Sequence, residues 1–332
     1  MTVEQAASTQ FGVNPKKIIP VRRAYKVIGE QGTFALKESR QNEADILFIH
    51  AAKEYLHEQG MPNLDRYVLT NEGSPYADIS GRLFVMSPWV ESREARYDSL
   101  ADGIPAAKCL AELHQKARGF APPIDTERIL WGAWPIIWQE QLMRLQQYKT
   151  MAEKQTAPSR FDIRFLRHVD GCMAQGREAL TMLANTQYRN ISDQYQIRGG
   201  ICHHDYSERN VLFTNDGNIH LVDFDYCICD LPIHDVVNFL RRIAKFSDYD
   251  GGHAHQILIA YLEKNPLTKE ELQLFVPLWL WPRKVWEVVH QYYGEGRTRP
   301  RRKYTDRLQH RCRVRSKEYR LLDHLIKIPE LT

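Results

Sequence analysis

The sequence predicts an α+β protein with a small, strand-rich N-terminal lobe and a large, mostly helical C-terminal lobe. Short apolar runs separated by glycine-containing turns occupy much of residues 1–88, with one stretch of helical apolar spacing between them. Further along the chain the spacing is that of helices, and a single hairpin pattern at residues 210–224 interrupts it. We therefore expect residues 1–88 to form a curled antiparallel sheet with one helix, and residues 89–332 to form the helical lobe.

The strands of the N-terminal lobe are predicted as two hairpins around one helix. Residues 25–38, YKVIGEQGTFALKE, contain two apolar runs that flank a glycine-rich turn. Residues 42–60 have apolar side chains at helical spacing and end in glycine, which is typical of a helix and its C-terminal stop. Residues 66–90 then predict strand, turn and strand, with Met-Ser-Pro-Trp near the end.

The C-terminal lobe is predicted to contain helices on both sides of its hairpin. The three helices expected before the hairpin cover residues 99–119, 129–148 and 160–186. In the second of them Trp131, Trp134 and Trp138 share one helical face, which is typical of a stripe packed into a core. Helices are expected again from the hairpin to the end.

Composition sets limits on the class of protein. The chain of 332 residues is 43% hydrophobic and 26% charged, as expected for a globular fold. No apolar run approaches the roughly 20 residues that a membrane-spanning helix needs, so we expect no membrane span. The six cysteines are irregularly spaced, which in a chain of this length favours reduced thiols in a cytosol-like compartment.

The central hairpin gathers three oxygen-bearing side chains. NVLF and IHLVDF are strand-like, and the Asp-Gly between them is a strong hairpin signal. If Phe213 pairs with Ile219, Asn210 falls within one position of Asp223 across the ladder. Asp205 lies five residues before Asn210, on the loop that leads into the first strand. The sequence therefore predicts a cluster at one end of this hairpin.

Carboxylates and a carboxamide in one place suit a hard cation such as Mg²⁺, which takes one or two protein oxygens beside phosphate and water oxygens. Phosphoryl transfer needs such a metal, a carboxylate that accepts the proton of the attacking hydroxyl, and a lysine on the phosphates. Asp205, Asn210 and Asp223 suit the first two roles. The alternative is a loop aspartate, a turn-capping asparagine and a strand-end aspartate with no common purpose.

The motif HHDYSERN resembles the H-x-D-x-x-x-x-N loop of the aminoglycoside phosphotransferase and choline-kinase-like families, which are relatives of protein kinases. VDFDY stands where those proteins have their Asp-Phe-Gly equivalent. The resemblance implies a two-lobed protein-kinase-like fold that binds ATP with Mg²⁺ between the lobes. By this match Asp205 is the catalytic base, and Asn210 and Asp223 hold the metal. Asp235, in IHDVVNFL, resembles the aspartate that ties the catalytic loop to the helical lobe.

Two segments of the N-terminal lobe extend the resemblance. FALKE resembles the strand that carries the phosphate-binding lysine, which would be Lys37. FVMSPWV resembles the hinge between the lobes, whose backbone holds adenine. The match implies that the carbonyl of Ser87 and the amide of Trp89 face the base, with Met86 behind it.

Within this superfamily the segments FALKESRQ, LFIHAAKEYLHEQG and HHDYSERNVLFTNDGNIHLVDFDYCICDLPIHDV resemble CotS-type spore coat proteins of endospore-forming bacteria. This resemblance implies synthesis in the mother-cell cytoplasm and deposition in the spore coat. Two functions stay open: an ATP- and Mg²⁺-dependent phosphotransferase acting on a small hydroxylated molecule or a coat component, or a catalytically silent structural protein of coat assembly.

Three departures from the kinase pattern bear on that choice. IIPVRRAYKV lacks the glycine or serine of a phosphate-binding loop, so Arg22 and Arg23 either contact phosphate by charge or are solvent-facing residues at a strand edge. Glu43 and Glu54 are the candidates for pairing with the lysine, and each is otherwise a solvated helix residue. The alternative is that His50 or an apolar neighbour occupies the position of the pairing glutamate. The usual glycine before the catalytic aspartate is replaced by His204.

The basic charge of the chain is local. Residues 297–320 contain eleven Lys/Arg and two acids, about +9, so the remainder of a chain with net charge +4 carries about −5. This segment is a candidate for docking acidic coat proteins or is a solvated helix, and we do not expect nucleic acid as its partner. The cysteines and histidines at residues 202–204 and 227–229 match no familiar zinc spacing, so no zinc site is expected.

Overall fold

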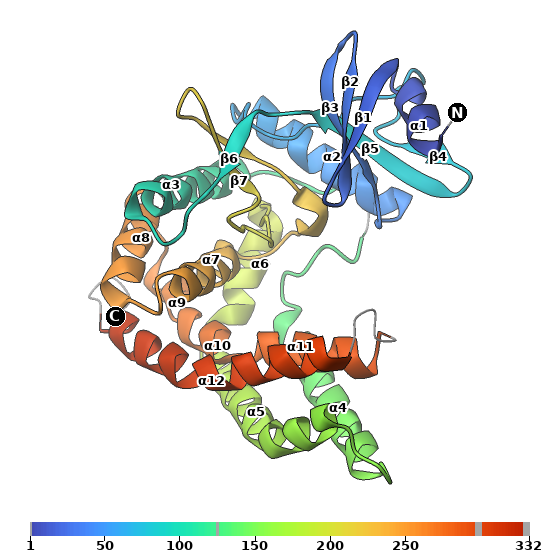
Figure 1. Ribbon diagram of the computed structural model, residues 1–332. Coiled ribbons are helices and arrows are strands. Elements are labelled where there is room, and N and C mark those ends of the chain that lie inside the picture. Colours follow the sequence, from blue (N-terminus) through green and yellow to red (C-terminus); the bar gives the residue numbers. More distant parts are fainter. Residues whose placement is uncertain (1, 124–125, 296–300, 328–332) are drawn as a thin grey trace. The chain divides into compact units, whose positions relative to one another are not determined.

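The computed structural model describes residues 2–123, 126–295 and 301–327 (Figure 1). The chain divides into two compact units. Unit 1 consists of residues 1–129, 195–239 and 260–265, and unit 2 of residues 130–194, 240–259 and 266–332. The predicted division into two lobes cuts the chain once, at residue 88, whereas these units each combine several segments, so that division stays a prediction. No helix of the described residues is long and apolar enough to cross a membrane.

Unit 1 contains a five-stranded antiparallel sheet with the strand order β1-β2-β3-β5-β4. The predicted hairpin at residues 25–38 is confirmed: β2 and β3 pair from Tyr25–Leu36 to Gly29–Gly32 around a two-residue turn. Helix α1, Val3–Gln10, which the sequence analysis does not predict, packs on β1 and β4. The strands are β1 Pro15–Val21, β2 Ala24–Gly29, β3 Gly32–Glu38, β4 Ala77–Ile79 and β5 Arg82–Pro88.

The second predicted hairpin of this region is confirmed in kind, but its first strand is much shorter than expected. Regular pairing begins only at Ala77, and the reversal occurs at Ser80 and Gly81, both at positive φ. The preceding residues instead make their own turn, in which the Thr70 amide donates to the Ser74 carbonyl. Local turn chemistry therefore outweighs the strand propensity of the apolar run at residues 66–69.

Helix α2, Glu43–Glu58, confirms the predicted helix. Asn42 is its N-cap, and the Asn42 side chain accepts a hydrogen bond from the Asp45 amide at 2.8 Å. The face with Ile46, Ile49 and Leu56 is buried, and α2 packs against η1, Phe224–Tyr226. The helix therefore lies directly beside the segment that follows the central hairpin.

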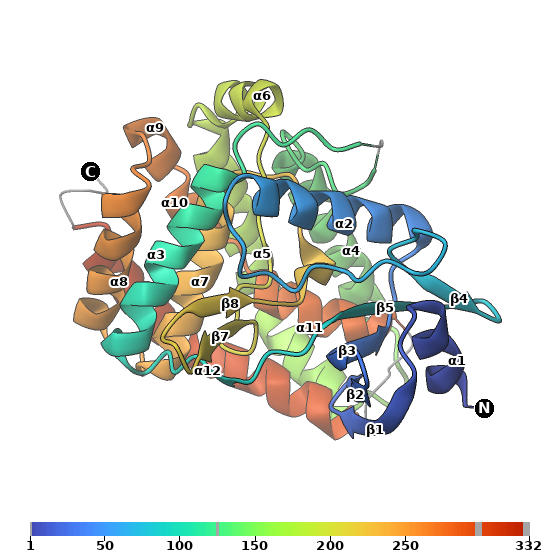
Figure 2. The ribbon, with the colours of Figure 1, turned by 90° about the horizontal axis from the view of Figure 1, so that it is seen from above.

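The central hairpin is confirmed with the predicted register. Phe213 pairs with Ile219, and β7 and β8 form a three-stranded sheet with β6 in the order β6-β7-β8. Helix α3 packs against β8 (Figure 2). The bounds are β6 Ser92–Glu94, β7 Val211–Thr214, β8 Ile219–Leu221 and α3 Leu100–Lys116.

Unit 2 is helical, with α5 at its centre. Helix α5, Arg160–Ala184, packs against α4, α10 and α12, and α11 packs against α4 and α12. The border between the units falls within α6, α7 and α8. The remaining helices are α4 Trp134–Glu153, α6 Tyr188–Arg198, α7 Pro232–Phe246, α8 Gly251–Lys264, α9 Lys269–Leu272, α10 Phe275–Leu280, α11 Arg283–Tyr293 and α12 Arg301–Leu325.

The tryptophan stripe is confirmed for two of its three members. Trp134 and Trp138 are buried, and the Trp138 ring stacks on Trp281 with centroids 4.5 Å apart. The inclusion of Trp131 is wrong, because α4 begins only at Trp134. Gly132 has a positive φ of 77°, which breaks the helical path before that point.

Candidate active site

The register of the central hairpin places Asn210 next to Asp223 in the ladder, and a bond within the preceding loop joins it to Asp205. The Val222 amide donates to the Asn210 carbonyl at 3.0 Å, which places Asn210 beside the end of β8. The Asn210 Nδ2 donates to the Asp205 carbonyl at 2.9 Å and to its carboxylate oxygen Oδ2 at 3.2 Å. The Asn210 side chain is thereby oriented by the same loop that carries Asp205, as the sequence predicts.

Asp223 lies one residue beyond that rung, in a left-handed conformation with φ 65° and ψ 61°. Aspartate tolerates this region better than most side chains, but it still favours glycine. The conformation is held by a hydrogen bond from the Asp223 amide to Asp65 Oδ2 at 2.9 Å. The turn out of β8 thus aims the carboxylate of Asp223 at Lys37 on β3.

Lys37 is held between two carboxylates. Its Nζ lies 2.6 Å from Asp223 Oδ1 and 2.7 Å from Asp225 Oδ2. Burial alone would lower the pKa of Lys37, but Asp225 and Asp223 outweigh it, and the pKa is raised. Burial alone would raise the pKa of Asp223, but Lys37 outweighs it, and that pKa is lowered. Lys37 and Asp223 are therefore both charged near neutral pH.

The structure answers which residue pairs with Lys37, a question that the sequence leaves open. Glu54 is taken by Arg66, whose Nε donates to it at 2.9 Å, and the Glu43 side chain bonds Tyr76. Neither of these two glutamates reaches the lysine. Asp225 is a site residue that sequence reasoning missed, although VDFDY contains it two positions after the predicted metal ligand.

In place of a glutamate, α2 contributes a buried lysine. The Lys53 side chain is only 1% exposed, and its Nζ lies 2.8 Å from Asp65 Oδ1 and 2.9 Å from the Asp65 carbonyl. The Nζ also sits 3.8 Å above the centroid of the Tyr67 ring. Because Asp65 caps the Asp223 amide, Lys53 supports the position of Asp223 through one intervening side chain.

Arg128 makes a second link between α2 and this segment. Its guanidinium donates to Asp45 Oδ1 at 2.6 Å and to Gln41 Oε1 at 2.7 Å, at the start of α2. It also donates to the carbonyls of Asp225 and Cys227, each at 2.9 Å. Nearly every donor of this side chain is used. Arg128 therefore fixes the backbone around Asp225, while Lys37 contacts the Asp225 side chain.

Asp235 binds the backbone of the catalytic-loop motif. Its carboxylate accepts hydrogen bonds from the amides of His203, at 2.6 Å, and His204, at 2.9 Å, and lies 3.3 Å from His114 Nε2. Burial would raise the pKa of Asp235, but the hydrogen bond and charge of His114 outweigh it and hold the pKa far below its usual range. Since His204 has a positive φ of 64°, these two bonds stabilise a strained backbone.

His114, Cys202 and Asp235 lie close enough together to resemble a metal site. Their polar atoms are used within the protein: His114 Nδ1 bonds the Tyr261 hydroxyl at 2.7 Å, and Cys202 Sγ donates to the carbonyl of Leu231 at 3.4 Å. Burial raises the pKa of the Cys202 thiol well above its ordinary value, which disfavours the thiolate that a metal needs. This cluster is structural packing around Asp235.

The hinge residues lie where the strand register puts them. Met86 is buried in the core of the sheet opposite Leu36, and Ser87 pairs with Ala35 on β3. The Trp89 amide donates to the Thr33 carbonyl at 2.9 Å, so in this structure it is already used by the sheet. The adenine contacts expected of Met86, Ser87 and Trp89 stay predictions, and that of Trp89 requires this bond to open.

The expected loop IIPVRRAYKV is a hairpin, with β1 and β2 joined at Arg22 and Arg23. Arg22 has a positive φ of 56° and pairs with Glu94 at 2.5 Å. Phosphate contact by these arginines stays a prediction.

These features define the class of protein as one with a protein-kinase-like fold. The parts of that fold are a small antiparallel sheet that carries a lysine, a hairpin that carries Asn210 and Asp223, and a helical region that follows it in the chain. The family described as "Spore coat putative kinase YutH" matches residues 4–325, and the chain belongs to it. Among curated proteins of Bacillus subtilis (strain 168), "Spore coat protein S" is 26% identical over 318 residues, covering 93% of this chain and 88% of that protein. "Endospore coat-associated protein YutH" is 21% identical over 301 residues, covering 88% and 83%.

Solved structures with the same fold are small-molecule phosphotransferases. An aminoglycoside phosphotransferase from Alicyclobacillus acidocaldarius has a TM-score of 0.79 at 20% identity, covering 98% of this chain and 96% of that one. The AMP-bound spectinomycin phosphotransferase APH(9)-Ia has a TM-score of 0.68 at 14% identity, covering 93% and 95%. The amicoumacin kinase hAmiN, in complex with AMP-PNP and Ca²⁺, has a TM-score of 0.61 at 18% identity, covering 92% and 88%. At these identities the likeness shows the fold alone.

Proposed function

We propose that the protein is a spore coat protein with an ATP- and Mg²⁺-dependent phosphotransferase site. One observation carries the proposal: Lys37 Nζ lies within hydrogen-bond distance of both Asp223 and Asp225. In the same unit, the loop that leads into the central hairpin joins Asn210 to Asp205. This combination of a lysine, carboxylates and a carboxamide is what phosphoryl transfer requires of a protein.

The donor set fits a hard divalent cation. Asp223 and Asp225 offer carboxylate oxygens, and Asn210 donates through its Nδ2 to Asp205, which leaves its own side-chain oxygen as an acceptor. Asn210 and Asp223 are the proposed ligands. Bound Mg²⁺ would neutralise charge on the phosphate oxygens. The solved relatives with bound AMP, and with AMP-PNP and Ca²⁺, support a nucleotide and a divalent cation as the ligands.

The protein side chains have distinct tasks in this proposal. Lys37 exchanges its two carboxylates for the α- and β-phosphates, and its raised pKa keeps it protonated for that task. Asp205 accepts the proton of the attacking hydroxyl, with its carboxylate oriented by Asn210 Nδ2. The acceptor is proposed to be a small hydroxylated molecule or a coat component.

A catalytically silent assembly protein of the spore coat is the second candidate. It is favoured by the Trp89 amide, which is taken up by Thr33, and by a β1–β2 turn without the glycines that let backbone amides approach phosphate. Under either function, family membership supports synthesis in the mother-cell cytoplasm and deposition in the spore coat. The basic helix α12 is the proposed docking surface for acidic coat partners.

The test is thermal melting of the purified protein with and without Mg·ATP, for the native chain and Asp223→Ala. A ligand at 100 times its Kd that binds only the folded state adds about 2.7 kcal/mol to the free energy of unfolding. We expect a rise in melting temperature that Asp223→Ala removes and that Asp216→Ala, at the exposed turn of the same hairpin, keeps. A native protein that does not respond to millimolar Mg·ATP would overturn the phosphotransferase and leave the assembly protein.

A further inference from the structure

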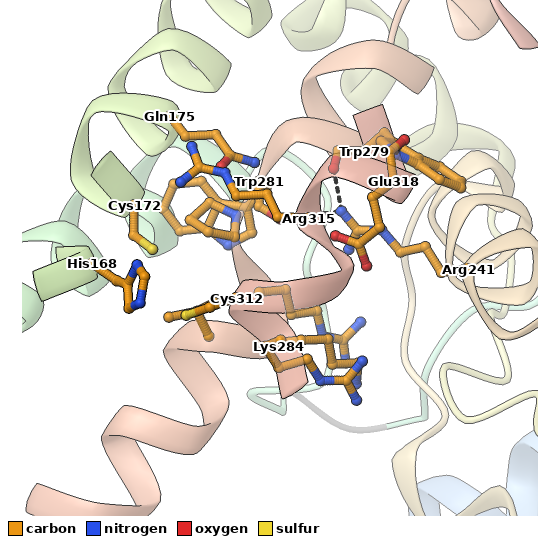
Figure 3. A pocket seen from close by; sticks show the side chains of 14 residues that line it. His168, Cys172, Gln175, Arg241, Trp279, Trp281, Lys284, Cys312, Arg315 and Glu318 are labelled. Carbon is orange, nitrogen blue, oxygen red and sulfur yellow. Dashed lines mark hydrogen bonds between the residues drawn. The ribbon is translucent and has the colours of Figure 1, made fainter. Parts of the chain in front are cut away.

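Unit 2 contains a pocket of about 60 Å³ between α5, α7, the start of α11 and α12, and Figure 3 shows the side chains that line it. Trp279 and Trp281 form part of its wall. None of the residues proposed for nucleotide, metal or catalysis belongs to it. Its chemistry therefore has to be explained separately.

The charge that lines this pocket is strongly unbalanced. One carboxylate lines it, that of Glu318. Five cationic side chains line it as well: Arg241, Arg283, Lys284, Arg311 and Arg315. Outside the lining, Glu287 accepts hydrogen bonds at 3.0 Å from Arg283 Nε and from Lys284 Nζ. With Glu287 included, the charges still sum to +3. Such an excess in a hollow of the protein is costly unless a counter-charge is bound.

Three of the cations have no carboxylate within ion-pair distance among the described residues. Arg241 is partly buried and donates to the carbonyls of Leu278 and Trp281, each at 3.2 Å, and of Trp279. Carbonyls satisfy its donors but carry no full charge, and burial lowers the pKa of Arg241 to about 10, although the carboxylates of Glu318 and Glu287 oppose that change. Arg315 donates to the Gly171 carbonyl at 3.3 Å.

Arg311 makes no hydrogen bond or ion pair with any residue that the structure describes. It lies four positions before Arg315 on α12, so the two guanidinium groups share one helical face. Like charges at this spacing repel each other. Burial also lowers the pKa of Lys284 to about 8, even though Glu287 opposes that change. All these groups gain from an anion placed among them.

The size and the donors of the pocket indicate which anion. A volume of about 60 Å³ holds several water molecules but is far below the roughly 300–1,000 Å³ of pockets that enclose a whole drug-sized ligand. Guanidinium forks match tetrahedral oxyanions by paired hydrogen bonds. Helix α11 begins at Arg283, which lines the pocket, so the positive end of its dipole favours an anion there.

We propose that this pocket, which we call the anion pocket, binds the phosphoryl group of a small phosphorylated molecule, with Arg311 and Arg315 as its principal contacts. The remainder of that molecule extends outside the enclosed space. The site is additional to the proposed phosphotransferase site and does not depend on it.

The test measures binding of inorganic phosphate and of sulfate by calorimetry and by thermal melting. Sulfate is included because it has one charge state at neutral pH. The ionic strength is held constant, and chloride is the reference anion. We expect millimolar binding by the full chain. Arg311→Gln/Arg315→Gln should weaken it at least tenfold. The control Arg302→Gln/Arg313→Gln removes the same charge from exposed positions of the same helix and should change it less than twofold.

Two further variants make the result decisive. Glu318→Gln removes the one opposing carboxylate of the lining and should tighten binding, an outcome that a damaged fold does not imitate. Lys37→Met removes the lysine of the proposed active site and should leave phosphate and sulfate binding unchanged. Equal losses in the pocket and control double variants, loss in Lys37→Met, or no binding by the native chain would each overturn the anion pocket.

Discussion

Unit 1 and unit 2 both gather charged side chains in partly buried places, but with opposite balance. Around the candidate active site three cations, Lys37, Lys53 and Arg128, each lie within 2.8 Å of a carboxylate. The carboxylates there outnumber them: Asp45, Asp65, Asp205, Asp223 and Asp225. In the anion pocket the cations are in excess, and three of them have no carboxylate partner among the described residues. A cluster with excess carboxylates is suited to receive a cation, and one with excess guanidinium groups to receive an anion.

This difference predicts that the paired charges of the active site stabilise the fold, whereas the unpaired cations of the anion pocket contribute little to stability without an anion. Removing one member of a buried pair leaves an uncompensated charge and is strongly destabilising. Removing a cation that has no partner leaves nothing uncompensated. The comparison can therefore be tested with single substitutions.

The largest effect is expected for Lys53→Met. Methionine keeps the length of the side chain but leaves the Asp65 carboxylate without its cation, so the free energy of unfolding should fall by about 3–5 kcal/mol. Urea denaturation measures it. The same change at Lys16, whose ion pair with Glu30 is exposed, should cost less than about 0.5 kcal/mol. Equal losses at the two positions would contradict the role of Lys53.

A smaller loss, of about 2–3 kcal/mol, is expected for Asp235→Asn, because an amide cannot accept from both amides of His203 and His204 as the carboxylate does. The pKa of Asp235 is depressed in the folded state, so its contribution is complete above the unfolded value and is lost as pH falls below about 4. The variant should therefore lose stability less steeply than the native chain on acidification. Melting from pH 3 to pH 7 checks both, with the exposed Asp170→Asn as control.

The smallest effect is expected for Arg311→Gln in the absence of added phosphate. This side chain has no hydrogen-bond or ion-pair partner among the residues described, so the free energy of unfolding should change by less than about 0.5 kcal/mol. The measurement is the same denaturation experiment in chloride. A loss comparable to that of Lys53→Met would show that the anion pocket is a structural cluster, and the contrast between the units would fail.

The sequence predicts the parts of the site that depend on local chain order. Asn210 and Asp223 are brought together by one hairpin, whose register follows from an Asp-Gly turn, and that register is confirmed. The supports of the site are not predictable in this way. Lys53, Asp65 and Arg128 lie on different segments of the chain, and nothing in the local sequence distinguishes any of them from an ordinary charged residue.

The anion pocket also could not be predicted, because it too depends on the tertiary fold, and the error at Trp131 has a local cause. Its cations come from three helices, and in the sequence the basic residues of α12 form one undivided run. The exposed Arg313 and the lining Arg315 differ only in the face of the helix. The spacing predicts Trp131 on a helical face, but the backbone at Gly132 breaks the helix before Trp134. The site roles of Lys37, Asp205, Met86, Ser87 and Trp89 stay predictions.

The bond from the Trp89 amide to the Thr33 carbonyl has a consequence for selectivity between nucleotides. Adenine presents an acceptor ring nitrogen beside a donor amino group, and a kinase hinge distinguishes it from guanine by offering one donor and one acceptor. Here the donor is the last rung of the β3–β5 ladder, and freeing it costs about 0.5–1.5 kcal/mol. If that rung stays closed, the base is read through the Ser87 carbonyl alone, and ATP loses much of its advantage over GTP.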